Sequence, residues 1–266
     1  MNVPSTLFRA LHVPGDPLVL VNAWDAASAR IVEASGAPAV ATTSAGVAWS
    51  LGVPDGGALD RDTALEAVAR IVRSVRVPVS ADIEDGFGAD PAGVAVSVER
   101  LRETGAVGIN IEDNRGGQLL DVAEAADRVA AAKQSGGADV FVNVRIDTYL
   151  LAAGDPAGRI DATLQRAAAY VAAGADGIFV PGTGDAAVIA ELVAGIAAPL
   201  NVAGSPGSPT VKELAALGVA RISTGAATAL TAYGALRRVL DGIAEDYEAE
   251  VGGVGYGELN DLLSGR

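Results

Sequence analysis

Cysteine is absent from the 266-residue sequence, and histidine occurs once, as His12. The lack of cysteine excludes disulfides, thiolate metal ligands and a cysteine nucleophile. A single histidine makes a Ser-His-Asp triad or a histidine-rich zinc site a poor explanation of function. Because His12 lies in a polar stretch before the first apolar segment, we expect it to face solvent.

Basic residues are scarce as well, with 19 Lys and Arg against 33 Asp and Glu and a net charge of −14. Nucleic acids and anionic membrane surfaces are bound through concentrated basic patches, so neither is an expected partner. No uncharged apolar run reaches the roughly 18 residues of a membrane helix, and the first residues lack the apolar core of a signal peptide. We therefore expect a cytoplasmic protein, in which a small anionic ligand would need local cations.

The sequence does have a regular alternation of short apolar runs and alanine-rich amphipathic segments. Half of its residues are hydrophobic, which allows a large core, and continuous apolar runs are typical of strands buried on both faces. The expected strands are Leu18–Trp24, Ala39–Ser44, Val77–Glu84, Val107–Asp113, Val140–Asp147, Gly177–Gly182, Pro199–Gly204 and Arg221–Gly225. The expected helices are Ala26–Ser35, Arg61–Ser74, Pro91–Glu103, Val122–Gln134, Arg159–Ala173, Ala186–Gly195, Thr210–Leu217 and, roughly, Ala226–Glu248.

Eight successive βα units without a linker favour a single (β/α)8 TIM barrel of the α/β class. We expect one domain, with the barrel over residues 18–248, including an extended C-terminal helix, and a glycine-rich tail over residues 249–266. A doubly wound open sheet is the structural alternative. Such a sheet usually carries a glycine-rich phosphate loop after its first strand, whereas the turn here is Asn22-Ala23-Trp24-Asp25-Ala26.

Three consecutive expected strands end in polar or charged residues. Catalytic groups of a barrel lie at the C-terminal ends of its strands, and alternate side chains along a strand share one face. The pairs and triplet that share a face are Asp82 with Glu84, Asn110 with Glu112, and Asn143 with Arg145 and Asp147.

These strand ends predict a metal site. Carboxylates crowded at one rim raise one another's pKa unless a cation joins them, and oxygen-only ligands favour Mg2+ or Mn2+ over zinc or copper. Arg145 could bind a carboxylate or phosphonate through two parallel hydrogen bonds. Structural salt bridges and helix caps are the competing interpretation, and it is the stronger one for three neighbouring acids, Asp25, Asp85 and Asp113.

Two loops are expected to reach the same rim. The turn Thr42-Thr43-Ser44-Ala45-Gly46 could leave backbone N–H groups open to an anion, and the segment 51–57 supplies Asp55; either could also be an ordinary turn. Trp24 could wall the pocket or pack in the core. Asn201 could donate a hydrogen bond to a substrate carboxylate, or it could only form hydrogen bonds within the loop that follows.

Taken together, these motifs resemble the isocitrate lyase/phosphoenolpyruvate mutase superfamily. The resemblance runs from about Asn22 to Ala226, and it is specific because the motifs occur in this order and spacing. They are Thr43-Ser44-Ala45-Gly46-Val47-Ala48 with Leu51-Gly52-Val53-Pro54-Asp55, Asp82-Ile83-Glu84-Asp85-Gly86-Phe87-Gly88, Ile111-Glu112-Asp113 and Val144-Arg145-Ile146-Asp147.

The resemblance implies a barrel of the phosphoenolpyruvate/pyruvate type in which Asp82 ligates Mg2+ (or Mn2+) directly. The acids that would hold the ion through water are Asp55, Glu84 and Glu112. Arg145 and the N–H groups near Ser44 and Ala45 would bind the carboxylate of a small 2-oxo acid, whose enolate the metal stabilises as a bond breaks. The catalytic candidates are thus Arg145, Glu112 and Asp55, and further substrate-binding candidates are Trp24, Thr43 and Asn201. The family also implies a homo-oligomer, a dimer or tetramer with an exchanged last helix.

The sequence departs from the family in two places. Lyases carry a Lys-Lys-Cys-Gly-His signature after the Glu-Asp motif, where this chain has the short segment Asn114–Leu120, and they carry a glutamate near Phe179–Gly182 that is missing here. We therefore expect a Mg2+-dependent enzyme that cleaves a C–C bond next to a 2-oxo acid, as a decarboxylase of an oxaloacetate-like acid or a lyase of a small diacid. The alternatives are P–C chemistry on a phosphonopyruvate-like substrate and a non-catalytic binder of 2-oxo acids.

Overall fold

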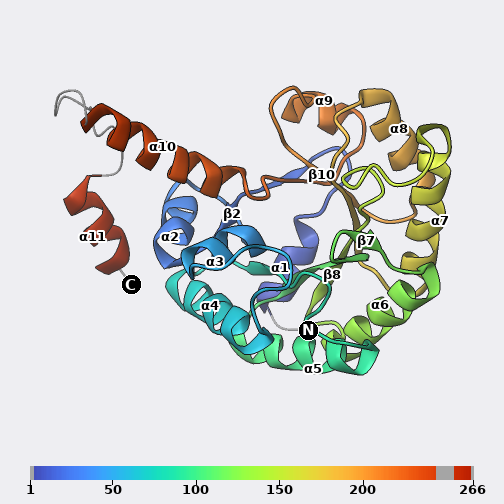
Figure 1. Ribbon diagram of the computed structural model, residues 1–266, viewed down its shortest axis with the longest axis horizontal. Coiled ribbons are helices and arrows are strands. Elements are labelled where there is room, and N and C mark those ends of the chain that lie inside the picture. Colours follow the sequence, from blue (N-terminus) through green and yellow to red (C-terminus); the bar gives the residue numbers. More distant parts are fainter. Residues whose placement is uncertain (1–2, 244–254, 265–266) are drawn as a thin grey trace.

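A parallel barrel surrounded by helices makes up the computed structural model, which describes residues 3–243 and 255–264 (Figure 1). The strand order is β1-β11-β10-β9-β8-β5-β4-β3-β2, and every pair in this sheet is parallel. The strands are β1 (Leu18–Leu20), β2 (Asn22–Ala23), β3 (Val40–Thr42), β4 (Val79–Asp82), β5 (Gly108–Glu112), β8 (Phe141–Arg145), β9 (Gly177–Val180), β10 (Leu200–Ala203) and β11 (Arg221–Ser223). Because β1 and β2 flank a single residue and pair with β11 and β3, they fill the place of one first strand and join the two ends of the sheet.

The helices form a ring outside the strands, as the alternation predicts, so the expected (β/α)8 fold is confirmed. The ring consists of α2 (Ala26–Ala34), α3 (Ser44–Ser50), α4 (Arg61–Ser74), α5 (Pro91–Thr104), α6 (Val122–Gly136), α7 (Arg159–Ala172) with the preceding 3-10 turn η1 (Pro156–Gly158), α8 (Ala186–Gly195) and α9 (Val211–Ala216). Two further helices, α10 (Ala227–Ile243) and α11 (Tyr256–Ser264), follow in the chain. No helix among the described residues is long and apolar enough to cross a membrane.

Aspartates begin many of these helices. The side chains of Asp25, Asp60, Asp90, Asp121 and Asp185 each accept hydrogen bonds from first-turn N–H groups, which would otherwise lack partners. A good part of the negative charge is therefore structural, as the sequence indicated for Asp25.

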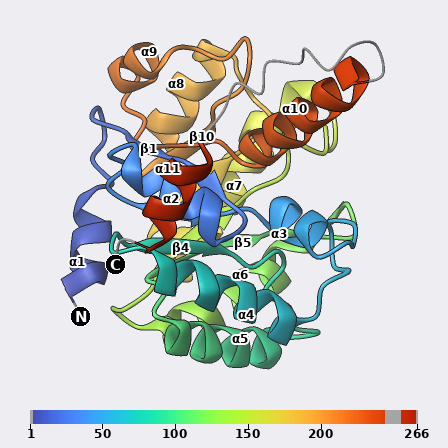
Figure 2. The same cartoon turned by 90° about the vertical axis from the view of Figure 1, so that its left-hand side faces the viewer.

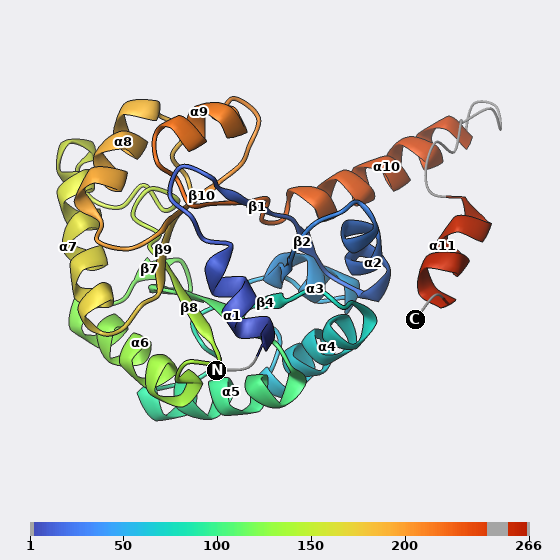
Figure 3. The ribbon, with the colours of Figure 1, turned by 180° about the vertical axis from the view of Figure 1, so that it is seen from behind.

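An additional helix, α1 (Val3–Ala10), closes the N-terminal end of the barrel, where Figure 3 shows it lying across the strands. Its residue Phe8 is fully buried against Phe141 at the start of β8. The expectation that His12 faces solvent is wrong. The His12 ring is 8% exposed and stacks on Phe141, with the centroids 4.1 Å apart.

Two loop segments differ from the expected turns. Ser44 begins the short helix α3 rather than an open βα turn, and the segment after β5 forms a small antiparallel hairpin of β6 (Asn114–Arg115) and β7 (Gln118–Leu119).

The C-terminal part separates from the ring. Helix α10 projects away from the barrel (Figures 1 and 2), and α11 returns to contact α2. In that contact Arg30 Nε donates to the Leu262 carbonyl over 2.6 Å. The expected end of the last helix at Glu248 and the first part of the 249–266 tail lie outside the described residues.

Candidate active site

The acidic residues at the ends of β4 and β5 and the arginine at the end of β8 meet at one mouth of the barrel. These strands are neighbours in the sheet. In sequence, α5 separates β4 from β5, and the β6–β7 hairpin and α6 separate β5 from β8. Asp82 is in register with Asn110, and Glu112 is in register with Arg145. Adjacent parallel strands therefore bring together the groups that the sequence analysis placed on one face.

Asp82 is fixed from two sides at the end of β4. Its backbone N–H donates to Thr42 Oγ1 over 2.8 Å, and its Oδ2 accepts from the Ser44 N–H over 3.2 Å. The Ser44 N–H, predicted to serve a substrate anion, thus points at a carboxylate of the chain itself. The start of α3 holds Asp82 in position.

Glu84 lies just beyond the strand, with a left-handed φ of 49°, a conformation that non-glycine residues adopt rarely. Glu84 lines the same mouth, and the residue is only 7% exposed. Burial, with the nearby charges of Asp82 and Asp55, raises the pKa of Glu84 to about 7. Gly57 N–H donates to this carboxyl and partly opposes the shift.

Glu112, Arg145 and Asp147 form a linked ion group on the other side of the mouth. Arg145 Nη1 donates to Glu112, and Arg145 Nε donates to Asp147 Oδ1 over 2.6 Å. Burial raises the pKa of Glu112 to about 8; Arg145 opposes this, while Asp82 and Asp147 add to it. Burial alone would lower the pKa of Arg145, but its two acidic partners raise it above the usual value. Arg145 is therefore a permanent cation with a fixed orientation.

A cavity of about 480 Å3 opens at this mouth, and Asp55, Glu84, Glu112 and Asn114 are among the residues that line it. Asp55 comes from the loop after α3, and its pKa is raised, first by burial and then by Asp82. The Ser44 hydroxyl donates to Asp55 and lowers that pKa in part. Loop 55–57 thus completes the acidic mouth.

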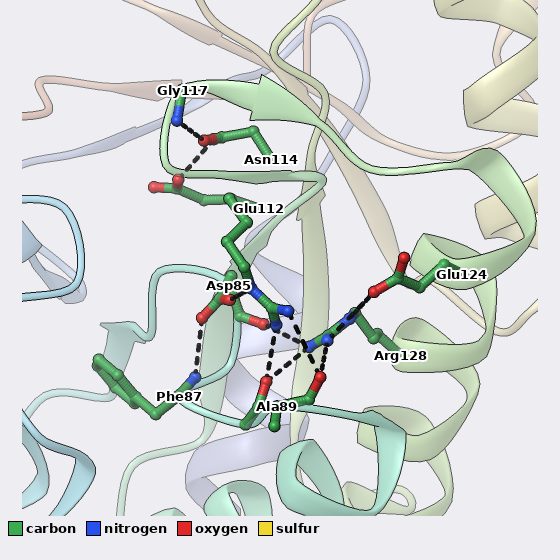
Figure 4. Close-up of polar contacts among 10 residues, drawn as sticks. Asp85, Phe87, Ala89, Glu112, Asn114, Gly117, Glu124 and Arg128 are labelled. Carbon is green, nitrogen blue, oxygen red and sulfur yellow. Dashed lines mark hydrogen bonds and ion pairs between the residues drawn. The ribbon is translucent and has the colours of Figure 1, made fainter.

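The β6–β7 hairpin forms one rim of this cavity and is tied down at its base and its side. At the base, Asn114 Nδ2 donates to Glu112 Oε2 over 2.8 Å (Figure 4), and it also donates to Asp147. At the side, Arg115 Nε donates to Asp85 Oδ2 over 2.6 Å, and its Nη2 donates to the Gly88 carbonyl over 2.8 Å. The loop after β4 and the hairpin after β5 are therefore joined.

Arg128 of α6 secures the loop after β4 from below. It is buried and donates to the carbonyls of Gly88 and Ala89 over 2.9 and 2.7 Å, and Glu124 accepts from it (Figure 4). Sequence reasoning overlooked Asn114, Arg115 and Arg128. The contacts of Arg115 and Arg128 with the loop after β4 join residues that are 26 to 43 positions apart in sequence. The buried amide of Asn114 bonds to Asp147, 33 positions away. A local sequence pattern does not indicate such contacts.

Other predicted site residues lie elsewhere. Trp24 lines a separate groove beside α2 rather than the mouth cavity. Thr43 and Ala45 are buried around the start of α3. Asn201 lies near the beginning of β10, and its side chain bonds to Ser223 Oγ over 3.0 Å. Its amide is thereby engaged inside the barrel, a placement that does not support the predicted contact with substrate.

The donor set fits a hydrated magnesium ion. Within the part of the chain that the structure describes, no three acidic or histidine side chains converge tightly enough to ligate one ion directly. Mg2+ commonly keeps several waters and takes only one or two protein carboxylates. Four carboxyl groups lie around one mouth, and three of them have raised pKa values. A divalent cation would reduce the repulsion between their negative charges.

The fold and this acidic mouth define the class of protein, a parallel (β/α)8 barrel with clustered carboxyl groups at the C-terminal ends of its strands. The family model described as phosphoenolpyruvate phosphomutase matches residues 8–244. The chain belongs to this family, within the isocitrate lyase/phosphoenolpyruvate mutase superfamily that its motifs resembled.

Several characterised enzymes are among the relatives. An uncharacterised protein of Mycobacterium tuberculosis is 43% identical over 88% of this chain and 89% of its own length. The 2-methylisocitrate lyase of Escherichia coli is 31% identical over 67% of this chain and 62% of its own length. The oxaloacetate decarboxylase of Ectopseudomonas mendocina is 30% identical over 75% and 69%, respectively.

Solved structures show the same architecture. A Burkholderia cenocepacia protein, provisionally assigned as a phosphonomutase, is 44% identical, with a TM-score of 0.87 over 90% of this chain and all of its own. A phosphonopyruvate hydrolase in complex with oxalate and Mg2+ is 25% identical, with a TM-score of 0.86 over 99% of this chain and 96% of its own. The superfamily members named here are lyases, decarboxylases, hydrolases and mutases, so the chain is assigned to an enzyme family of lyases and mutases.

Proposed function

We propose that this protein is a Mg2+-dependent lyase that cleaves a C–C bond next to a 2-oxo acid, with decarboxylation of an oxaloacetate-like acid as its first candidate reaction. The observation that carries the proposal is the mouth itself. Asp55, Glu84 and Glu112 line a cavity. Asp82 lies close enough to raise the pKa of Glu84, and the oriented Arg145 is paired with Glu112. The similarity to an oxaloacetate decarboxylase supports the choice of substrate class.

We assign a separate role in metal or substrate binding to each residue of the mouth. Asp82 would hold Mg2+ directly, and Asp55, Glu84 and Glu112 would hold it through water. When bound, Mg2+ would polarise the 2-oxo group and stabilise the negative charge that develops on it. Arg145 is held by Nε and Nη1, which presets its guanidinium for a substrate carboxylate.

Decarboxylation suits the short hairpin. In a diacid lyase the carbanion of the departing acid needs a positioned protein acid to protonate it. In a decarboxylase CO2 leaves without a proton, and the enolate that remains takes its proton from water. The β6–β7 hairpin supplies no cysteine or histidine. A lyase of a small diacid is the close variant, supported by the similarity to 2-methylisocitrate lyase.

P–C bond chemistry on a phosphonopyruvate-like acid is the second candidate. The family model and the solved phosphonopyruvate hydrolase support it, because the same metal-stabilised enolate serves C–C and P–C cleavage. The experiment is a turnover screen of small 2-oxo acids, diacids and phosphonates with Mg2+ or Mn2+, read by mass spectrometry beside a calorimetric binding assay. CO2 release supports the first candidate, phosphate release the second, and binding without turnover overturns both in favour of a 2-oxo acid binder.

The metal-free protein should lose stability as pH rises. Glu84 and Glu112 have folded pKa values of about 7 and 8 against an ordinary value of 4.5, so their stabilising protonated forms persist at low pH and are lost as pH rises through 7 to 8. Because the unfolded chain releases these protons near pH 4.5, we expect Tm without metal to fall between about pH 5 and 8 and to level off above that, and we expect saturating Mg2+ to remove most of the fall. Scanning calorimetry tests this, with Glu84→Gln expected to flatten the profile. An equal profile with and without Mg2+ would contradict the metal site.

The projecting helix α10 supports the further proposal of a homo-oligomer. Its exposed apolar side chains recur every three or four residues and therefore share one face. They are Leu230, Tyr233, Leu236 and Leu240, which are 39–58% exposed. A groove of about 530 Å3 beside α2, lined by Val19, Ile31 and Val32 among others, is the apolar surface that such a face of a second copy would cover.

Light scattering at micromolar concentration should therefore show a dimer or tetramer. Leu236→Glu should dissociate it, because the charge would be buried in the interface. Leu150→Glu is the matched control, since Leu150 is similarly exposed but lies outside α10. A monomeric wild-type protein would refute the assembly.

A further inference from the structure

A buried arginine crosses the interior of the barrel below the acidic mouth. Arg221 is 0% exposed at the start of β11, and its Nη2 reaches Asn110 Oδ1 on β5 over 3.2 Å. Its Nε donates to Ser223 Oγ over 3.1 Å. These partners are neutral, and no ion pair within residues 3–243 and 255–264 includes Arg221. Burial lowers its pKa to about 9, and Asp82 opposes that shift, so the guanidinium stays charged at neutral pH.

Two buried side-chain nitrogens lack a hydrogen-bond partner among the described residues, Arg221 Nη1 and His12 Nε2. Both side chains are more than nine-tenths buried. They also lie at the same end of the barrel. His12 stacks on Phe141, which is in register with Gly108 on β5. Arg221 bonds to Asn110, two residues further along the same strand. Unpaired polar atoms of this kind are costly in a protein interior, and two of them close together call for one explanation.

The two nitrogens are complementary in hydrogen-bonding character. His12 Nδ1 lies 2.8 Å from the Phe8 carbonyl, which can only accept, so Nδ1 carries the ring proton. Burial lowers the pKa of His12 to about 3, and the charges of Arg221 and Arg9 add to this shift. The hydrogen bond to the Phe8 carbonyl and the charge of Asp176 oppose it in part. The ring is therefore neutral. Nε2 is therefore an acceptor, whereas Arg221 Nη1 is a donor.

We propose that a buried water molecule bridges Arg221 Nη1 and His12 Nε2 and thereby fastens the N-terminal segment to the inside of the barrel. Water accepts from the arginine and donates to the imidazole, which satisfies both atoms. A halide would suit the arginine but would face the lone pair of Nε2. The bridge extends the bonds from Arg221 to Asn110, in register with Asp82, down to the end of the barrel that α1 covers (Figure 3).

The single histidine makes the bridge measurable in solution. In 15N NMR spectra of the whole protein the only imidazole should show the Nδ1–H tautomer and should not titrate between pH 5 and 8. Its ring should also cross-relax with a long-lived water proton. A crystal structure from bromide-containing solution should show a water within hydrogen-bond distance of both nitrogens and no anomalous scattering at that position.

The matched variants are His12→Gln and His12→Phe. Gln can place an acceptor near the position of Nε2, whereas Phe keeps the stacking on Phe141 but removes the acceptor. Both variants lose the Nδ1 bond to the Phe8 carbonyl, and only His12→Phe also loses the acceptor. We expect the Tm of His12→Phe to lie roughly 2–4 °C below that of His12→Gln, the shift typical of one hydrogen bond in a chain of this size. A bromide peak, a direct His12–Arg221 bond, or titration of the imidazole near pH 6.5 would overturn the proposal. Each of these results is independent of whether the enzyme turns over a 2-oxo acid.

Discussion

Asp82→Asn is expected to abolish Mg2+ binding and turnover together. Asn keeps an oxygen that can accept from the Ser44 N–H, so the local fold should survive, but the charge that attracts the cation is lost. Losing an outer-shell partner of a metal typically weakens binding by roughly 10–100-fold, and a direct ligand should cost more. Glu84→Gln, at a position expected to act through water, should weaken affinity less.

Isothermal calorimetry with Mg2+ and Mn2+ measures this difference. Asp185→Asn is the matched control, because Asp185 is an exposed helix cap on α8 and Asn caps a helix equally well. The control should bind metal as the wild type does. An Asp82→Asn protein that binds Mg2+ normally and stays active would remove the central claim about the mouth.

Arg145→Met is expected to lose turnover and also to destabilise the protein. The substitution leaves Glu112 and the fully buried Asp147 without their cation. Removing one partner of a buried ion pair typically costs about 3–5 kcal/mol of unfolding free energy. Arg145→Lys keeps the charge but not the fork that bonds Glu112 and Asp147 at once. It should restore most of the stability and little of the activity.

Denaturant unfolding and steady-state kinetics on the same preparations separate the two effects. Arg70→Met is the control, since Arg70 forms an exposed pair with Glu66 on α4, and exposed pairs contribute roughly 0–1 kcal/mol. If Arg145→Lys were as active as the wild type, Arg145 would serve the fold and not the substrate.

The barrel and the core of its site could be predicted from the sequence because both follow from local patterns. Apolar runs indicate the buried strands. The residues at the C-terminal end of each run lie at the mouth, because all strands of a parallel barrel point the same way. β4, β5 and β8 end at Asp82, Glu112 and Arg145, one or two residues before the expected ends at Glu84, Asp113 and Asp147. The roles of Asp82, Glu112 and Arg145 as ligand and substrate contacts stay predictions.

What the sequence could not predict depends on contacts between distant segments. His12 is buried because Phe141, far along the chain, provides a stacking surface, although its own neighbours are polar. Helix α3 has seven residues, and its cap Thr43 makes no side-chain bond, so neither periodicity nor a capping signal marks it. Asn201 is engaged by Ser223 of the neighbouring strand, and strand pairing is not visible in a single apolar run.

The tethered hairpin over the mouth has a kinetic consequence. Enzymes that close a loop over the substrate are often limited by its reopening. Here Asn114 and Arg115 fasten the β6–β7 hairpin to Asp147 and Asp85, while the tip at Gly116 and Gly117 stays exposed. Substrate and product should then exchange faster than bonds break. The rate-limiting step becomes the chemical one, and KM approaches the dissociation constant of the substrate.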